Sequence, residues 1–166
     1  MSSNDTNPAI DPIKLRNAFG CFVTGVTVIT GRDKNDKLVG MTANSFSSVS
    51  LNPPLALWSV AETATAFDVF REASHFTIHI LHSGQEQVSR QFASKNIEKF
   101  AGFDYDIGIG GVPRLTDYAA RFECSTEFRY PGGDHIILVG RILAFDKTDK
   151  EPLVFYKGQY KTLAEK

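Results

Sequence analysis

The sequence has few of the features that mark secreted or nucleic-acid-binding proteins. Its 166 residues include only two cysteines, Cys21 and Cys124, and carry a net charge of -1 at pH 7. The cysteines lie far apart in apolar, strand-like surroundings and lack the CxxC spacing of a zinc or redox site. We therefore expect two buried thiols in a reducing compartment rather than a disulfide. The small net charge provides no long-range field that would attract nucleic acid or anionic lipid.

Long apolar runs are also missing. No run approaches the ~20 residues that a membrane-spanning helix needs. The first seven residues are polar and lack the apolar core of a signal peptide. We therefore expect a cytoplasmic protein that works without a membrane or a nucleic acid. Because the chain has no excess of positive charge, a bound anion would have to be held by local donors.

Length and composition indicate one globular domain. A chain of 166 residues can bury roughly two thirds of its unfolded surface. The hydrophobic fraction of 42% and the charged fraction of 22% are ordinary for such a domain. We expect residues 1–10 to form a flexible arm and residues 11–166 to form a single domain without internal repeats.

Strand-like segments dominate the chain. Short runs rich in Val, Ile, Thr and Phe alternate with turns rich in Gly, Pro and Asp, without regular βαβ alternation. This pattern predicts a mainly β fold, an antiparallel barrel with three short peripheral helices. The helices are expected after an N-cap at Asp11, over residues 65–72, and from a capping box at residues 83–86 to about residue 94. The strands are expected over residues 22–30, 38–50 (one or two strands), 55–60, 75–81, 121–130, 135–145 and 153–156, with a loop over 98–113.

Residues 40–55 are the most distinctive segment. They read Gly-Met-Thr-Ala-Asn-Ser-Phe-Ser-Ser-Val-Ser-Leu-Asn-Pro-Pro-Leu, which is rich in hydroxyl and amide side chains and carries no charge. Such a composition suits neither a hydrophobic core nor a charged, solvated face. The segment is either an edge strand that runs into a loop, or a surface that offers backbone N–H groups and hydroxyls to a phosphate-bearing ligand without Lys or Arg.

Three further positions have both a structural and a functional interpretation. Gly25 interrupts a strand, either as a bulge or because a flat ligand approaches the main chain there. His135 follows Gly133 and Asp134, which a turn needs for backbone reasons alone. It is either a surface histidine or a group that donates or exchanges a proton in a pocket. Tyr156 begins an aromatic, polar tail that packs on the barrel or a partner subunit, or contacts a ligand.

The sequence gives little support for a metal site, a side-chain nucleophile or a glycine-rich dinucleotide-binding motif. Along one strand, His75 and His79 would lie ~13 Å apart at 3.3 Å per residue, too far for one metal ion without a bend. With His82 in the next turn, we therefore expect no zinc site. No GxSxG turn is present, no sequence feature activates either cysteine as a nucleophile, and no glycine-rich dinucleotide fingerprint follows a strand.

Five short motifs occur in a characteristic order. They are Phe22-x-x-Gly25-x-Thr27-Val28-x-Thr30, Gly40-Met41-Thr42-Ala43-Asn44-Ser45-Phe46, Ser50-Leu51-Asn52-Pro53-Pro54, Gly133-Asp134-His135, and Pro152-Leu153 with Tyr156. Together they resemble the short-chain flavin reductase family, the small reductase components of two-component flavin-dependent monooxygenases. The resemblance spans residues 15–163. It implies a Greek-key-like FMN-binding split β-barrel that binds FMN or FAD at a homodimer.

The resemblance also implies the site residues. His135 matches a histidine near the nicotinamide and is the expected catalytic residue, which positions the carboxamide rather than serving as an obligatory acid. No metal is expected. The chain departs from the family at residues 58–62, where relatives more often carry an Arg. The implied flavin-binding residues are Thr24, Gly25, Val26, Thr27, Met41, Thr42, Ala43, Asn44, Ser45, Phe46, Ser47, Ser59, Thr63, Thr65, Phe92, Lys99, Phe100, His135 and Tyr156.

The implied reaction is hydride transfer from NADH or NADPH to FMN or FAD, after which the reduced flavin passes to a separate oxygenase component. No side-chain nucleophile is needed, because the flavin and the nicotinamide carry the chemistry. Two alternatives stay open: a flavin-dependent reductase of another acceptor such as ferric iron, and a flavin-binding module without turnover. FMN and FAD, and NADH and NADPH, are equally compatible with the sequence.

Overall fold

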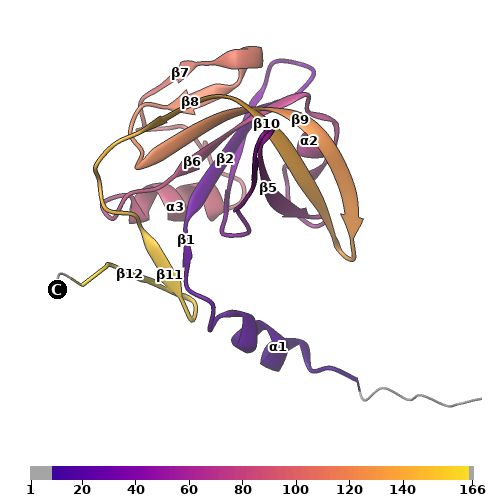
Figure 1. Cartoon of the computed structure of the whole chain (residues 1–166), viewed down its shortest axis with the longest axis vertical. Coiled ribbons are helices and arrows are strands. Elements are labelled where there is room, and N and C mark those ends of the chain that lie inside the picture. Colours follow the sequence, from indigo (N-terminus) through magenta and orange to yellow (C-terminus); the bar gives the residue numbers. More distant parts are fainter. Residues whose placement is uncertain (1–8, 165–166) are drawn as a thin grey trace, which may run out of the picture.

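A seven-stranded antiparallel sheet forms the body of the protein (Figure 1). The computed structural model describes residues 9–164. The large sheet has the order β3-β2-β6-β9-β10-β5-β4, and two small sheets pair β1-β11-β12 and β7-β8. The strands are β1 Thr24–Gly25, β2 Thr27–Arg32, β3 Leu38–Ala43, β4 Ser47–Leu51, β5 Pro54–Ala61, β6 His75–Ile80, β7 Tyr105–Ile107, β8 Pro113–Leu115, β9 Ala120–Gly132, β10 His135–Lys147, β11 Val154–Tyr156 and β12 Gln159–Lys161. The helices are α1 Pro12–Phe19, α2 Phe67–Glu72 and α3 Glu86–Ala93, with a 3₁₀ turn η1 at Ile109–Gly111. The predicted mainly β, antiparallel fold with peripheral helices is confirmed.

The chain connectivity forces the large sheet to curl. Strands β3 and β4 lie at opposite edges of the sheet, yet only residues 44–46 join them. The four Cα–Cα steps from residue 43 to residue 47 can span at most about 14 Å, so the two edges must come together. The Ser45 hydroxyl donates to the Ser59 carbonyl at 3.1 Å and accepts from the Ser59 N–H at 2.9 Å, which fastens this link to β5. The curled sheet is therefore a barrel with a seam at residues 44–46.

Two apolar clusters fill the fold. In the first, the Trp58 ring meets Phe70 of α2 edge-on at 4.9 Å and Phe76 of β6 at 5.9 Å. Along β5 the side chains alternate between this core and the outer surface, as expected for a strand with one buried face. In the second cluster, Phe92 of α3 packs with Val28 and its neighbours on β2. Helices α2 and α3 thus cover different parts of the barrel.

Helix α1 begins as the sequence predicts, and it is tied to the described barrel by the hydrogen bond from the Lys157 N–H to the carbonyl of its C-cap, Gly20, at 3.0 Å. The Asp11 side chain accepts hydrogen bonds from the backbone N–H of Ile13 at 2.8 Å and of Lys14 at 3.3 Å, which confirms the N-cap. No residue of α1 is buried. Figure 1 shows the helix lying apart from the barrel. Apolar side chains such as Phe19 are exposed. The predicted arm over residues 1–10 falls mostly outside the described residues.

Several local predictions are wrong. Helix α3 begins at Glu86, and the preceding Gln85 makes no side-chain cap. The Gln85 amide instead accepts from the His82 N–H and donates to the Asp117 carbonyl, both at 2.9 Å, so it holds a turn. The expected loop over 98–113 contains the β7–β8 ribbon. Within the described residues, no helix is long and apolar enough to cross a membrane.

The two cysteines differ from each other. Cys124 is buried, and this burial raises its thiol pKa to about 12. Cys21 is exposed, because it lies in the turn between the end of α1 and the start of β1 at Thr24. The prediction of two buried thiols is therefore half wrong, whereas both cysteines are free as expected.

Candidate functional site

The outer face of strands β5 and β10 brings several predicted site residues together. Ser59 lies opposite Ile137, and Ala61 lies opposite His135. Because Trp58 and Val60 point into the core, their neighbour Ser59 points outward. The seam places Ser45 directly against Ser59. Ser45, Ser59 and His135 therefore share one side of the barrel wall.

His135 is held by the turn that precedes it. Its Nδ1 lies 2.6 Å from Asp134 Oδ1, and the hydrogen bond and charge of the imidazole lower the pKa of the Asp134 carboxyl. The carboxylate is an acceptor only, so Nδ1 carries the proton in the neutral ring. The Asp134 carbonyl accepts from the Glu62 N–H at 2.9 Å, which ties the turn to the end of β5. The other ring nitrogen, Nε2, stays available on a half-buried side chain.

A second group forms where β1 pairs with β11. Thr24 lies opposite Phe155, which precedes Tyr156, and Gly25 lies opposite Val154. A methyl group built on Gly25 would meet only the Leu153 carbonyl, at 4.0 Å. The packing of the fold therefore does not require a glycine at position 25. This favours the interpretation that the glycine allows a ligand to approach the main chain closely. The Thr24 hydroxyl is buried and has no hydrogen-bond partner among the described residues, so it is a polar group that a ligand could satisfy.

Other predicted residues serve the framework. The Thr27 hydroxyl donates to the Ala43 carbonyl and the Thr42 hydroxyl to the Ser89 carbonyl, both at 2.6 Å. Val26 lies in the second apolar cluster. The Thr27 and Thr42 hydroxyls and the Val26 side chain already contact other parts of the protein. A ligand would therefore contact the backbone of these residues and not their side chains. Met41 and Phe46 are half-buried and pack against the first cluster.

The α3 region differs most from its expected role. The Phe92 ring is only 1% exposed and lies in the second cluster, with Phe100 against its edge at 5.2 Å. A contact between the Phe92 ring and a flavin is therefore incompatible with this packing. The Lys99 ammonium donates to the Phe92 carbonyl at 2.9 Å and to the Ser94 carbonyl, so it caps the end of α3. Partial burial lowers the pKa of Lys99.

Residues 19–164 match the family described as a flavin reductase like domain. An FMN reductase (NADH) from Agrobacterium fabrum is 43% identical over 88% of this chain and 83% of that protein. The chain belongs to the flavin reductase family. It spans only 51% of a relative from Acinetobacter baylyi, the reductase component of a flavin-dependent trigonelline monooxygenase, which is 40% identical over 95% of this chain.

Solved structures agree with this membership. The NADH:FAD oxidoreductase of Streptomyces globisporus superposes with a TM-score of 0.87 at 35% identity, covering 95% of this chain and 92% of that one. A second structure of that protein is described as a complex with NAD and FAD fragments.

For a flavin reductase, the exposed neutral side chains are the most suitable ligand contacts. Asn44 lies in the seam, Ser47 directly follows it, and Thr63 and Thr65 follow β5. All four are exposed and none is charged. None of these residues is an Arg or a Lys, in keeping with the neutral composition of residues 40–55.

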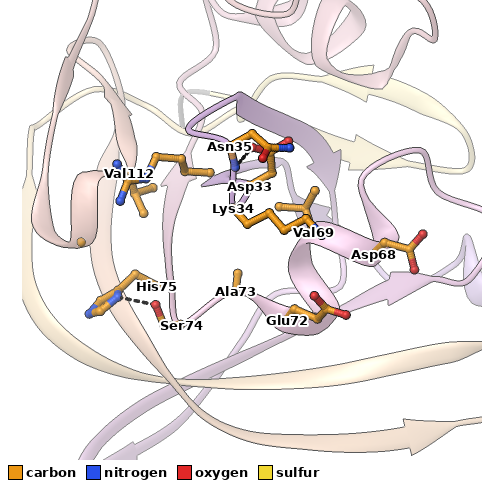
Figure 2. Close-up of a pocket in the computed structure, with 12 residues that line it drawn as sticks. Asp33, Lys34, Asn35, Asp68, Val69, Glu72, Ala73, Ser74, His75 and Val112 are labelled. Atoms are coloured by element: carbon orange, nitrogen blue, oxygen red, sulfur yellow. Dashed lines mark hydrogen bonds between the residues drawn. The ribbon is translucent and has the colours of Figure 1, made fainter.

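A cavity of about 540 Å³ lies elsewhere on the protein. Figure 2 shows Ser74 and His75 on one side of it and the β2–β3 turn with Asp33 and Lys34 on the other. Side chains of both charges line it, and none of the predicted site residues does. The cavity is therefore separate from the proposed flavin surface.

Sequence motifs did not indicate two aromatic residues of β9 that lie beside the candidate site. The Phe128 and Tyr130 rings lie 5.9 Å apart at an interplanar angle of 27°, and 45% and 50% of these residues are exposed. Tyr130 lies opposite Ile137 and Phe128 opposite Val139, so both share the outer face of His135. The alternation in Phe128-Arg129-Tyr130 was the available signal, since it places both aromatics on one face of a strand.

Proposed function

We propose that this protein transfers hydride from NADH to FMN or FAD and supplies the reduced flavin to a separate oxygenase component. The observation that carries the proposal is the polar, uncharged surface around Asn44 and Ser59, beside His135, in a chain that matches flavin reductases over nearly its whole length. The relatives' names favour NADH as the donor.

The chain's own residues bind and orient the two reactants. When bound, the flavin accepts the hydride, and the protein contributes geometry and electrostatics. Ser45 holds the seam, so that the backbone and side chains of residues 44–47 face the ligand in a fixed conformation. The open approach at Gly25 and the unsatisfied hydroxyl of Thr24 fit a flat ligand with polar edges.

His135 positions the nicotinamide. Asp134 keeps the proton on Nδ1, which leaves Nε2 as an acceptor for the N–H of the carboxamide. When the hydride-donating carbon of the nicotinamide is held close to the flavin, the bimolecular reaction becomes an effectively unimolecular step. The histidine needs no proton transfer for this role.

A surface of neutral donors favours release of the reduced flavin. Charge-assisted bonds from Arg or Lys are roughly twice as strong as neutral ones, and the exposed contacts named above include no such group. We therefore propose that flavin is a diffusing substrate, which a separate oxygenase partner requires.

We further propose that residues 11–166 act as one catalytic domain in a cytoplasmic homodimer. Helix α1 and the residues after it expose Ile13, Phe19 and Phe22 by 72%, 69% and 78%. Exposed apolar surface of this extent marks an interface, and a second copy of the chain presents the same surface in a two-fold arrangement. The exposed free thiol of Cys21 suits a reducing compartment.

The test is NADH oxidation by the purified protein, titrated with FMN, FAD and riboflavin and repeated with NADPH. Saturable turnover that depends on free flavin supports the reductase. Turnover of a ferric complex at substoichiometric flavin would instead identify a reductase of another acceptor. Flavin binding without oxidation of either donor would refute the reductase and leave a binding module.

A further inference from the structure

The C-terminal hairpin β11–β12 is tied to helix α3 by one tyrosine. Tyr160 Oη lies 2.8 Å from the hydroxyl oxygen of Ser89, a fully buried residue of α3 that lies 71 positions earlier in the chain. Because its partner is fully buried, the Tyr160 hydroxyl is directed into the protein and away from a ligand. Figure 1 shows the hairpin below α3 and beside β1, with which β11 pairs.

The ring of Tyr160 is held from two sides. Phe155 lies opposite it in the hairpin, and the two rings meet edge-on at 5.6 Å. The Arg90 guanidinium lies 4.9 Å from the ring centroid and is itself bound to the Glu86 carboxylate at 2.5 Å. These contacts keep the ring in place when only its hydroxyl is removed, so Tyr160→Phe tests the hydrogen bond to Ser89 alone.

Ser89 is also bonded to β3. The Thr42 hydroxyl donates to the Ser89 carbonyl at 2.6 Å, and the Ser89 N–H donates to the Gln85 carbonyl within the helix at 3.1 Å. Thr42 is followed by Ala43, the last residue of β3, and then by the seam at residues 44–46. Ser89 is therefore a fixed point that binds both the C-terminal hairpin and the strand that leads into the seam.

The hairpin also holds the second group of site residues. Strand β1, which carries Thr24 and Gly25, pairs with β11. The following strand β2 pairs with β3, which joins this group to the seam from one side. The hydrogen bonds through Tyr160, Ser89 and Thr42 join the same two groups from the other side, by way of α3. The separation between the two groups is thus set by a closed ring of contacts.

We propose that Tyr160 is a positioning residue for the flavin, which acts through Ser89 to set the separation between the Thr24–Gly25 group and the seam. This inference rests on the proposed function, because it takes both groups as flavin contacts. A ligand that contacts two groups at once binds more tightly when they are already held at the right separation. A misplacement of about 1 Å caused by a remote residue can lower a rate by about a hundredfold. Tyr160 therefore contributes to flavin binding without touching the flavin.

The alternative is a purely structural role, in which the Tyr160–Ser89 bond stabilises the fold and does nothing for the ligand. The two roles differ in what they change. A structural bond alters the free energy of unfolding and leaves the flavin affinity of the folded molecules as it was. A positioning bond alters that affinity as well.

The decisive experiment measures flavin affinity and stability in Tyr160→Phe. The dissociation constants for FMN and FAD, from quenching of flavin fluorescence, should rise about tenfold, as expected when one hydrogen bond is lost and the buried Ser89 hydroxyl is left unpaired. In turnover the KM for flavin should rise by the same factor. The KM for NADH at saturating flavin should stay unchanged, because His135 on β10 lies outside the ring of contacts.

The matched control is Tyr118→Phe. The Tyr118 hydroxyl donates to the Asp146 carboxylate at 2.6 Å, at the end of β10 that lies farthest from His135. This variant also loses one tertiary hydrogen bond of a tyrosine, so its urea midpoint should fall. Its flavin dissociation constants should equal those of the wild type.

Ser89→Ala and the double variant Y160F/S89A complete a double-mutant cycle. Both single variants break the same bond, so the double variant should bind flavin no more weakly than Tyr160→Phe. Ser89→Ala also provides the affinity comparison if Tyr160→Phe folds poorly. Losses of affinity that multiply in the double variant would show that the two residues act independently, and would refute the proposed connection.

Two further results would overturn the positioning role. Unchanged flavin affinity in Tyr160→Phe, with a lower urea midpoint, would leave Tyr160 a structural residue only. An equal loss of affinity in Tyr118→Phe would attribute the effect to a general loosening of the barrel. A wild-type protein that binds flavin without oxidising NADH would refute the proposed function, while the binding comparison still decides the role of Tyr160. Absence of flavin binding by the wild type would overturn both.

Discussion

His79 makes the stability of the protein depend on pH between about 4 and 6.5. It is fully buried on β6, and burial lowers its pKa from 6.5 to about 4. Its Nε2 lies 2.9 Å from the Leu115 N–H, which can only donate, so this nitrogen is an acceptor. Nδ1, 3.0 Å from the Val28 carbonyl, therefore carries the proton. The neutral ring thus bridges β2 and the β7–β8 ribbon.

The size of the effect follows from the shift in pKa. Between pH 6.5 and 4, His79 is protonated in the unfolded chain and neutral in the folded protein. Each pKa unit is worth 1.36 kcal/mol, so the free energy of unfolding falls by roughly 3 kcal/mol as the pH drops through this window. The contribution is fully present above pH 6.5. Protonation would also turn Nε2 into a donor facing the Leu115 N–H, which would release the ribbon from the barrel.

The assay is urea unfolding of the wild type and of His79→Gln at several pH values from about 7 to about 4.5. The single tryptophan, Trp58, is buried in the first apolar cluster and reports the loss of the core. The variant loses one of two buried hydrogen bonds and should be about 1–3 kcal/mol less stable at neutral pH. It cannot take up the proton, so its stability should fall less steeply below pH 6.5. Equal slopes for both proteins would refute the reasoning.

Three further variants test the barrel and the site. A methyl group in Gly40→Ala would lie 2.5 Å from Cε1 of Phe92, so unfolding should become about 1–3 kcal/mol easier; an unchanged urea midpoint would contradict this close packing. Ser45→Ala loses both bonds to the Ser59 backbone, which should cost about 1–3 kcal/mol and raise the KM for flavin; a lower stability with an unaltered KM would mean that the seam does not shape the flavin site. His135→Asn should lower kcat/KM for NADH while flavin binding, measured by fluorescence quenching, stays the same; equal losses in both would argue against a role confined to the nicotinamide.

Local signals predicted the elements whose structure depends on local chemistry. Asp11 caps α1 and the Gly133 turn opens β10, because capping and turn geometry are properties of a few adjacent residues. The capping box before α3 failed, since the Gln85 amide finds partners in the His82 turn and at Asp117, far along the chain. Tertiary hydrogen bonds outweighed a local motif.

Only part of the candidate site could be predicted from the sequence. The motif order indicated residues 40–46 and the Gly133-Asp134-His135 turn as site segments, and the structure brings Ser45, Ser59 and His135 to one face. Phe92 was assigned to the flavin although its spacing from Val88 already placed it on the inward face of α3. The position of Phe128 on the same face as His135 depends on strand register, which no motif encodes.

The three-residue link between β3 and β4 couples the stability of the closed barrel to the binding of its ligand. A reductase that releases its flavin in every cycle spends part of its time with that surface bare, and the Ser45–Ser59 pair then keeps the two sheet edges together unaided. Any ligand that binds only the closed barrel adds to this hold in proportion to its concentration. Abundant flavin should therefore lengthen the lifetime of the protein in the cell, and flavin scarcity should expose the seam to proteases first.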